Sequence, residues 1–355
     1  MFTLQTVHQL YKTPTTNSLS KSIKYTIIGK SSYFEHLSMG LYRKFILPLN
    51  IIASLLVLNA SVFTQEPNVR DKQKVRPVTI PISIYTKKEI RSDQTEEFIQ
   101  ADRLIVREDK EEQTILSIRS VAGTPLEIAI LIQEDLTGNF NLQIKDIADF
   151  IRKLPKGTRV MVGYLRGGNL QTAAKFTEDL EKAAKSLRIV SGVSYGGNGP
   201  YGGVHDALKR FEALPNGRRA VLLVSDGVDT SQGSSPGDLT QTIDLDRSIA
   251  RAQKFGVAVY SFYSPTPLTE NRNAQLTLGG QSSLQRIADE TGGRAFFQGN
   301  IAPISFLPFF KDLDILLGRQ FALTYLSTHM KKGYHKVEVM STNPEVKIEH
   351  PKGYV

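Results

Sequence analysis

Two groups of polar side chains follow apolar runs of this chain. Gln133, Asp135 and Thr137 come after the run Ile128–Ile132, and Asp226 comes after a second apolar run further along the chain. In open α/β sheets, ligands bind at the carboxyl ends of the strands. These residues are therefore the first candidates for a site.

A glycine-rich loop offers a second chemistry. Gly197–Gly202 reads GNGPYG, a G-x-G-x-x-G pattern, and Asp226 lies 24 positions after Gly202, a spacing found in dinucleotide-binding folds. The residues before the loop form a weak strand, and Pro200 fixes φ inside the proposed turn. We interpret the loop as a turn that enters a helix. A nucleotide-binding enzyme that uses this loop stays open as an alternative.

No other pattern in the chain predicts an enzyme. There is no G-x-S-x-G motif and no cysteine. His329, His335 and His350 lie in the C-terminal segment without ligand spacing to one another or to nearby carboxylates. We therefore expect no catalytic residues, no enzymatic activity and no metal site in that segment.

The net charge of +9 does not predict a nucleic-acid partner. Residues 1–60 hold six basic residues and one acid, a balance of +5, which leaves only +4 for the remaining chain. No basic stripe with interleaved aromatic residues is present. The chain also lacks cysteine, which is compatible with an oxidising compartment.

The N-terminal region reads as a targeting segment. Residues 1–38 form a polar extension, and 39–65 combine basic residues, the apolar core Ile51–Leu58 and small residues after it. This order is typical of a signal peptide, with an uncleaved N-terminal anchor as the alternative. Because such a signal belongs at a terminus, Met39 is a candidate for the true start. We expect a secreted or periplasmic protein that meets the membrane only through this segment, if it is uncleaved.

The remaining chain predicts an α/β fold between two β segments. Alternating apolar residues from Val78 begin a small β domain over 75–122. Over 123–318 strands and helices alternate, which predicts a doubly wound, mostly parallel sheet with helices on both faces. Residues 319–355 predict an antiparallel β tail that packs on the β domain. We expect Thr266–Gly280 to be a polar loop, which either rims the site or is disordered.

The loop that begins at Asp226, together with the segment after the glycine-rich loop, makes the chain resemble a known family. The segments VLLVSDGVDTS, from Val221, and VHDAL, from Val204, are similar to those of von Willebrand factor A (VWFA) domains. Over roughly residues 75–355 the chain resembles a bacterial family of secreted VWFA-related proteins. The resemblance implies a protein-interaction or adhesion module of the envelope or the extracellular space, with protein partners. A purely structural envelope module is a further alternative.

The resemblance also implies a metal-ion-dependent adhesion site (MIDAS), from whose motif this chain departs. The family places Asp-x-Ser-x-Ser in the first loop, Thr in the second and Asp in the third. Those positions hold Gln133, Asp135, Thr137, Gly202 and Asp226 here. Because Mg²⁺ requires near-octahedral geometry, we expect a degenerate site. Asp135, Thr137 and Asp226 are its remaining candidate ligands, for Mg²⁺ or another divalent cation bound weakly.

Overall fold

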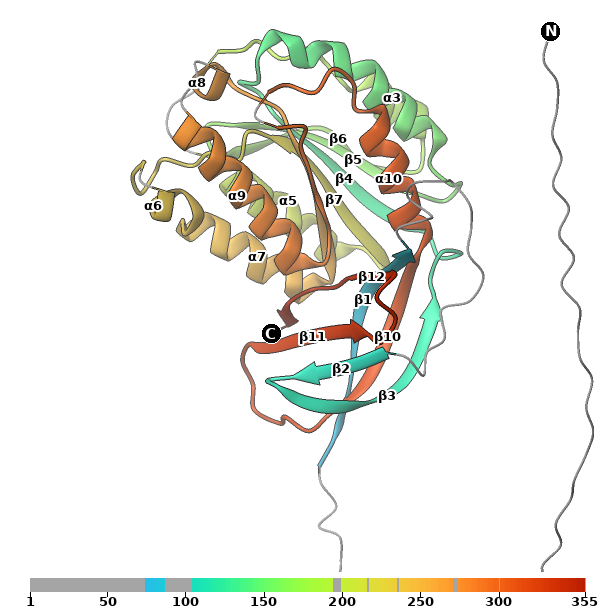
Figure 1. The fold of residues 1–355 in the computed structure, drawn as a ribbon. Coiled ribbons are helices and arrows are strands. Elements are labelled where there is room, and N and C mark those ends of the chain that lie inside the picture. Colours follow the sequence, from blue (N-terminus) through green and yellow to red (C-terminus); the bar gives the residue numbers. More distant parts are fainter. Residues whose placement is uncertain are drawn as a thin grey trace, which may run out of the picture. The chain divides into compact units, whose positions relative to one another are not determined.

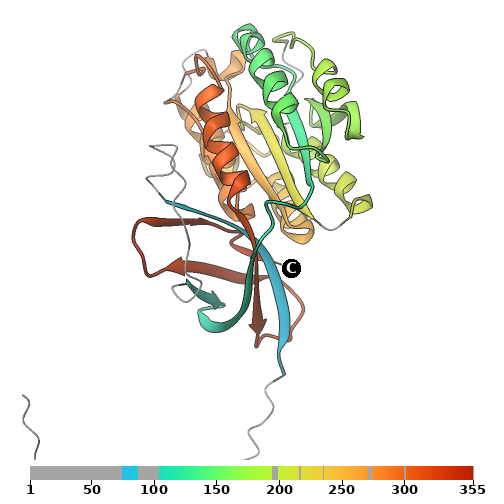
Figure 2. The ribbon, with the colours of Figure 1, turned by 90° about the vertical axis from the view of Figure 1, so that its right-hand side faces the viewer.

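The computed structural model describes residues 74–86, 104–193, 199–215, 217–234, 236–270, 274–299 and 301–354. These residues belong to one compact unit, Arg70–Val355. Their strands form a six-stranded and a seven-stranded sheet, which Figure 1 and Figure 2 show from two directions. The predicted extension 1–38 and the targeting segment 39–65 lie outside the described residues.

The six-stranded sheet contains both apolar runs. Its strands are β4 (Leu126–Gln133), β5 (Arg159–Arg166), β6 (Asn169–Thr177), β7 (Arg218–Ser225), β8 (Val257–Tyr263) and β9 (Ala295–Phe296). Their spatial order is β6-β5-β4-β7-β8-β9, with β6 antiparallel to β5 and the other pairs parallel. Every residue of β4 and β7 is buried, as expected for strands covered on both faces. The predicted α/β class is confirmed, with a mixed sheet.

Helices pack against the two faces of this sheet. The residues of β4 alternate between them: Ile128, Ile130 and Ile132 join one apolar cluster, and Ala129 and Leu131 join the other. The first cluster includes residues of α3 (Ile144–Lys153), α4 (Leu180–Lys185) and α10 (Leu307–Gly318). The second includes residues of α5 (Tyr201–Leu208), α7 (Ile243–Phe255) and α9 (Ala274–Thr291). The shorter helices are η2 (Gly138–Gln143), η3 (Lys209–Ala213), α6 (Pro236–Thr240) and α8 (Pro267–Glu270). None of these described helices has both the length and the apolarity needed to cross a bilayer.

The segment Thr266–Gly280, predicted as a polar loop, is largely helical, so that prediction was wrong. It holds α8 and the first turns of α9. Gly279 and Gly280 read as loop residues in the sequence, but they serve close packing. A Cβ at Gly279 would collide with Leu239, and one at Gly280 would collide with the backbone oxygen of Asp226. Tertiary contact at these glycines therefore outweighs their low helix propensity.

Strands from both ends of the described chain build the seven-stranded sheet. They are β1 (Arg76–Thr86), β2 (Leu104–Glu108), β3 (Glu111–Ser120), β10 (Gln320–Ser327), β11 (His335–Ser341), β12 (Val346–Glu349) and β13 (Gly353–Tyr354). Their order is β12-β1-β10-β3-β2-β11-β13, with antiparallel neighbours throughout. A separate apolar cluster that includes Ile80, Ile82 and Leu323 forms its core. The structure thus places strands of 75–122 and of 319–355 in one sheet.

Arg218, the first residue of β7, joins the two sheets. Its guanidinium donates to Gln320 Oε1 at 2.9 Å and to the carbonyl oxygen of Ala122 at 3.1 Å, and also to that of Leu317. Gln320 begins β10 of the seven-stranded sheet, and Leu317 lies at the end of α10. The Arg218 side chain is 7% exposed, so these acceptors have little access to water.

Replacing Arg218 by Met should lower the free energy of unfolding by about 2–4 kcal/mol, since buried acceptors lose a charged donor. Urea unfolding, read as the midpoint at unchanged slope, measures the loss. Arg247→Met on α7 is the matched control. That side chain is 65% exposed, so its loss should cost less than about 0.5 kcal/mol. Equal losses in the two variants would contradict a joining role for Arg218.

Candidate functional site

The carboxyl ends of β4, β7 and β8 meet at one edge of the six-stranded sheet. Ile132 of β4 lies opposite Val224 of β7, and Ser225 lies opposite Tyr263 of β8. The loops that follow these strands therefore start side by side, as the parallel strands in Figure 1 indicate. We call the loops 134–137, 226–230 and 264–266 the site edge.

The side chain of Gln133 connects the ends of β4 and β7. Its Oε1 accepts hydrogen bonds from Ser225 Oγ at 2.5 Å and from the backbone N–H of Asp226 at 3.1 Å. Ser225 Oγ in turn accepts from the N–H of Gly227 at 2.8 Å. The amide oxygen at this motif position is thus occupied by internal hydrogen bonds.

Asp226 points into the protein and uses both of its carboxylate oxygens. Oδ1 accepts from the N–H of Val228 at 3.0 Å, and Oδ2 accepts from the Thr266 hydroxyl at 2.6 Å. The residue is 1% exposed. Burial raises its pKa, and the nearby charge of Asp135 acts in the same direction. The hydrogen bonds from Thr266 and Val228 favour the charged form, and the net result is a pKa of about 6. Asp226 therefore caps its own loop.

Asp135 and Thr137 offer the freer oxygens of the first loop. Asp135 is partly exposed. Burial raises its pKa, and the charge of Glu134 adds to this, whereas a hydrogen bond from Gln133 lowers it by less. The hydroxyl of Thr137 is buried without a hydrogen-bond partner, while its N–H donates to the oxygen of Pro265 at 2.9 Å. An unsatisfied buried hydroxyl is unusual and could serve as a metal ligand.

Gly202, at the position where the family has Thr, lies against a neighbouring turn. A Cβ at Gly202 would approach the carbonyl oxygen of Gly168 to 2.6 Å. The packing of α5 on this turn therefore requires glycine and leaves no room for a hydroxyl ligand. Residues 194–198, which include the first glycine of the Gly197–Gly202 pattern, lie outside the described residues.

The described end of that pattern packs on the site edge. A Cβ at Gly199 would collide with Asp229. Tyr201 is fully buried, and its hydroxyl donates to the oxygen of Gly227 at 3.0 Å. Protein atoms thus fill the space next to this part of the loop.

These residues fit a Mg²⁺ ion only in part. Both oxygens of Asp226 and the amide oxygen of Gln133 accept hydrogen bonds within the protein, and Gly202 supplies no ligand. Asp135 and Thr137 remain as donors of oxygen. Because Mg²⁺ needs near-octahedral geometry, this set is weaker than the family motif.

Two residues of the site edge have roles that sequence reasoning missed. Glu134 turns away from the candidate ligands and pairs with Arg188 at 2.6 Å. Arg188 also stacks on the ring of Tyr164, with its guanidinium carbon 4.0 Å from the ring centre. Thr266 holds Asp226, and its only sequence signal is its position shortly after the apolar strand β8.

Exposed apolar side chains lie on two segments next to the first loop of the site edge, where a Cβ at Gly192 would lie 3.5 Å from the oxygen of Leu136. Leu142 is 76% exposed, Ile189 is 72% exposed and Val193 is 54% exposed. Asn141 joins their segments, because its side chain accepts from the N–H of Val190 at 2.8 Å and donates to its carbonyl oxygen at 3.2 Å. We call Leu142, Ile189 and Val193 the apolar rim.

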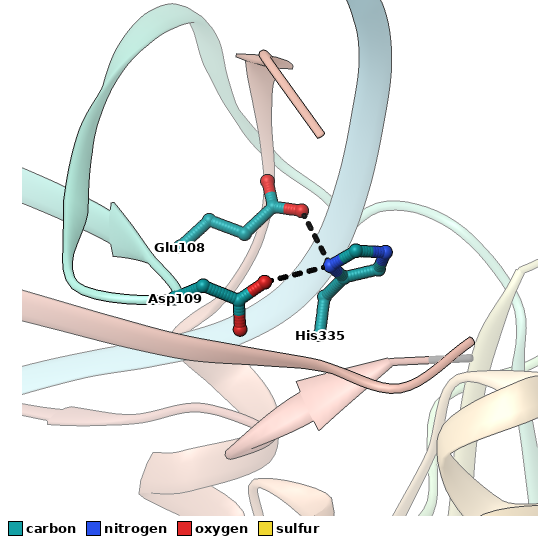
Figure 3. Close-up of side chains that lie close together, drawn as sticks. All are labelled: Glu108, Asp109 and His335. Atoms are coloured by element: carbon teal, nitrogen blue, oxygen red, sulfur yellow. Dashed lines mark hydrogen bonds and ion pairs between the residues drawn. The ribbon is translucent and has the colours of Figure 1, made fainter. Parts of the chain in front are cut away.

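A second cluster of charged residues lies in the seven-stranded sheet, where the sequence predicted no metal site. Glu108, Asp109 and His335 bring one ligand atom each to within 4.8 Å of one another, as Figure 3 shows. It is the only group of three such side chains among the described residues. Antiparallel pairing of β2 with β11 brings these positions together across the sequence, so spacing along the chain does not reveal the cluster.

Comparisons with known proteins give structural neighbours only. No family model matches the chain, and no curated protein matches it. One similar solved structure is the conserved hypothetical protein BatB from Bacteroides thetaiotaomicron, with 17% identity and a TM-score of 0.39, covering 53% of this chain and 95% of that one. Another is the vWF domain of the type V pili tip protein Mfa5 from Porphyromonas gingivalis, with 12% identity and a TM-score of 0.37, covering 54% and 94%.

A von Willebrand factor type A protein from Catenulispora acidiphila is also similar, with 11% identity and a TM-score of 0.35, covering 78% of this chain and 72% of that one. Scores this low support no conclusion about activity. The solved structures similar to this chain thus include von Willebrand factor type A domains. The segment VLLVSDGVDTS, from Val221, resembles the same family.

Proposed function

We propose that this chain is an exported protein-interaction or adhesion module of the VWFA type, working in a bacterial envelope or outside the cell. The observation that carries the proposal is the apolar rim around the first loop of the site edge. Large apolar side chains that stay mostly exposed beside a binding loop are typical of surfaces that contact other proteins. Export rests on the targeting pattern of residues 39–65 in the sequence.

The metal site of the family is degenerate in this proposal. In adhesion domains of this type the ion would join the loop ligands to a carboxylate of the partner. Here Asp226 is held by Thr266 and Val228, and Gly202 contributes no side chain. Recognition would then depend on the apolar rim, with at most weak binding of a divalent cation by Asp135 and Thr137.

The proposal includes no enzymatic activity. A nucleotide at the Gly197–Gly202 loop would bring phosphates close to Asp229, against which Gly199 packs. Burial raises the pKa of the Tyr201 hydroxyl, and the nearby carboxylates of Asp226 and Asp229 also raise it. Anionic neighbours oppose phosphate binding, so this surface favours a protein partner over a nucleotide.

Asp226→Asn should stabilise the protein at neutral pH. A carboxylate whose pKa rises from 3.8 in the unfolded chain to about 6 in the fold destabilises the folded state above that range. Thr266 can accept a hydrogen bond from the new amide. The gain should reach at most about 3 kcal/mol near pH 8 and vanish as the pH falls below about 4. Chemical unfolding at several pH values measures it, and a variant less stable throughout would show that Asp226 is needed as a charge.

Gln133→Asp with Asp135→Ser should create divalent-cation binding, because it restores the first loop of the motif beside Asp226 and Thr137. Calorimetry with Mg²⁺ and Mn²⁺ should detect binding in this variant that exceeds binding to the parent. Adding Gly202→Thr should instead lower stability, since its Cβ would meet Gly168 O at 2.6 Å. Strong Mg²⁺ binding by the parent itself would contradict degeneracy.

Leu142→Ser with Ile189→Ser should weaken partner binding without unfolding the chain, because both side chains are mostly exposed. The full chain serves as bait for the envelope fraction of the cell that produces it, and the amount of each captured protein is compared. The matched control is Leu116→Ser, which changes an apolar side chain 52% exposed on β3, in the other sheet. Partners captured equally by all variants would place recognition away from the apolar rim.

A further inference from the structure

The turn between β2 and β3 presents carboxylates toward the start of β11. Glu108 ends β2, Glu111 begins β3, and the two residues between them have positive φ, 49° at Asp109 and 74° at Lys110. Two positive φ values in a two-residue loop define a tight hairpin turn in which Asp is favoured. The turn holds Asp109 next to Glu108 and opposite His335 (Figure 3).

One nitrogen of His335 faces both carboxylates. Nδ1 lies 2.8 Å from Asp109 Oδ2 and 3.6 Å from Glu108 Oε1. The other ring nitrogen, Nε2, lies 2.8 Å from the carbonyl oxygen of Lys331 and donates to it. Histidines that bind metals usually donate their second N–H to a carbonyl or a carboxylate, which fixes the ring. His335 has this arrangement, with Nδ1 as the ligand atom.

His329 lies beside the group, in the loop between β10 and β11. Its Nδ1 is buried without a hydrogen-bond partner and lies 3.7 Å from Glu108 Oε1. Its Nε2 faces Asp109 at 3.9 Å and Glu111 at 3.7 Å. The two nitrogens thus face different carboxylates of the cluster, and His329 stays outside the group of three converging ligand atoms.

Glu108 is buried without a full set of partners. It is 0% exposed, and its Oε2 has no hydrogen bond. Oε1 accepts from the Tyr354 hydroxyl at 2.6 Å, while Arg76 donates to that hydroxyl. Within the described part of the chain, its ion-pair partners are the two histidines alone. A buried carboxylate is costly unless a cation compensates it.

We propose that Glu108, Asp109 and His335 form a site for a divalent transition-metal ion, with Zn²⁺ as the best match, a water as the fourth ligand and His329 beside it. Zinc takes imidazole nitrogen and carboxylate oxygen in tetrahedral geometry, with ligand bonds near 2.1 Å and hence ligand atoms about 3.4 Å apart. His335 Nδ1 and Glu108 Oε1 lie 3.6 Å apart, close to this value. His335 Nδ1 and Asp109 Oδ2, now hydrogen-bonded at 2.8 Å, would move slightly apart around an ion. Imidazole ligands disfavour Mg²⁺ and Ca²⁺, which prefer oxygen alone.

Such an ion would connect the β2–β3 turn to the loop before β11. It would also neutralise Glu108, which already accepts a hydrogen bond from the hydroxyl of Tyr354 in strand β13. The site is independent of the site edge, and its function is to stabilise the seven-stranded sheet.

The test is a metal titration of the full chain after chelator treatment and dialysis. Calorimetry with Zn²⁺ should show one ion bound per chain and a raised melting temperature, since a ligand specific to the folded state stabilises it. Mg²⁺ should produce neither effect. Co²⁺ in the same site should give the strong visible absorption of a tetrahedral complex.

His335→Gln and Glu108→Gln should each lower zinc affinity more than tenfold and abolish the cobalt absorption. His205→Gln, on α5 beside the other sheet, is the control and should bind as the parent does. Asp109→Asn changes a ligand whose side chain is 36% exposed, so it tests the site if a buried substitution prevents folding. Absence of zinc binding by the parent, or unchanged zinc and cobalt binding in folded His335→Gln or Asp109→Asn protein, would overturn the proposal.

Discussion

The burial of β4 and β7 on both faces is the constraint on which the rest of the structure depends. Their carboxyl ends carry polar groups that have little access to water, and buried polar groups must find partners. Gln133 meets this need by accepting from Ser225 Oγ and from the N–H of Asp226. The same arrangement turns Asp226 inward toward Thr266. Hydrogen bonds within the protein therefore connect the ends of the two strands.

The two ends of β7 have different roles. Arg218, at the amino end, binds Gln320 of the seven-stranded sheet, and Asp226 follows the carboxyl end. A strand of eight residues spans about 26 Å, so the site edge is separated from the contact between the sheets. Arg294 and Glu349 add a second contact, at 3.0 Å.

Much of the fold could be predicted from the sequence, because apolar runs determine which strands are buried. The runs at 128–132 and 220–224 give the centre of the sheet, and the polar residues after them give Asp135 and Asp226 as site residues. Gly279 and Gly280 misled the prediction, since glycine marks loops locally but here allows α9 to pack on the Asp226 backbone. Glu134 pairs with Arg188, and Asp226 accepts from Thr266. These contacts depend on the direction of each side chain, which the hydrophobic periodicity of the sequence does not specify.

The cluster at Glu108, Asp109 and His335 was beyond sequence reasoning for a topological reason. Motif spacing detects ligands that share one helix, one strand or one loop, whereas strand pairing between β2 and β11 joins residues about 230 positions apart.

The two candidate cation positions also differ in chemistry. The site edge offers carboxylate and hydroxyl oxygens, and Gln133 and Asp226 use theirs in internal hydrogen bonds. The other cluster keeps a buried carboxylate whose ion-pair partners among the described residues are histidines. A carboxylate in that position needs positive charge more than Asp226 does, because Asp226 already receives hydrogen bonds on both oxygens. Internal hydrogen bonding at the site edge is therefore compatible with the proposed metal site in the seven-stranded sheet.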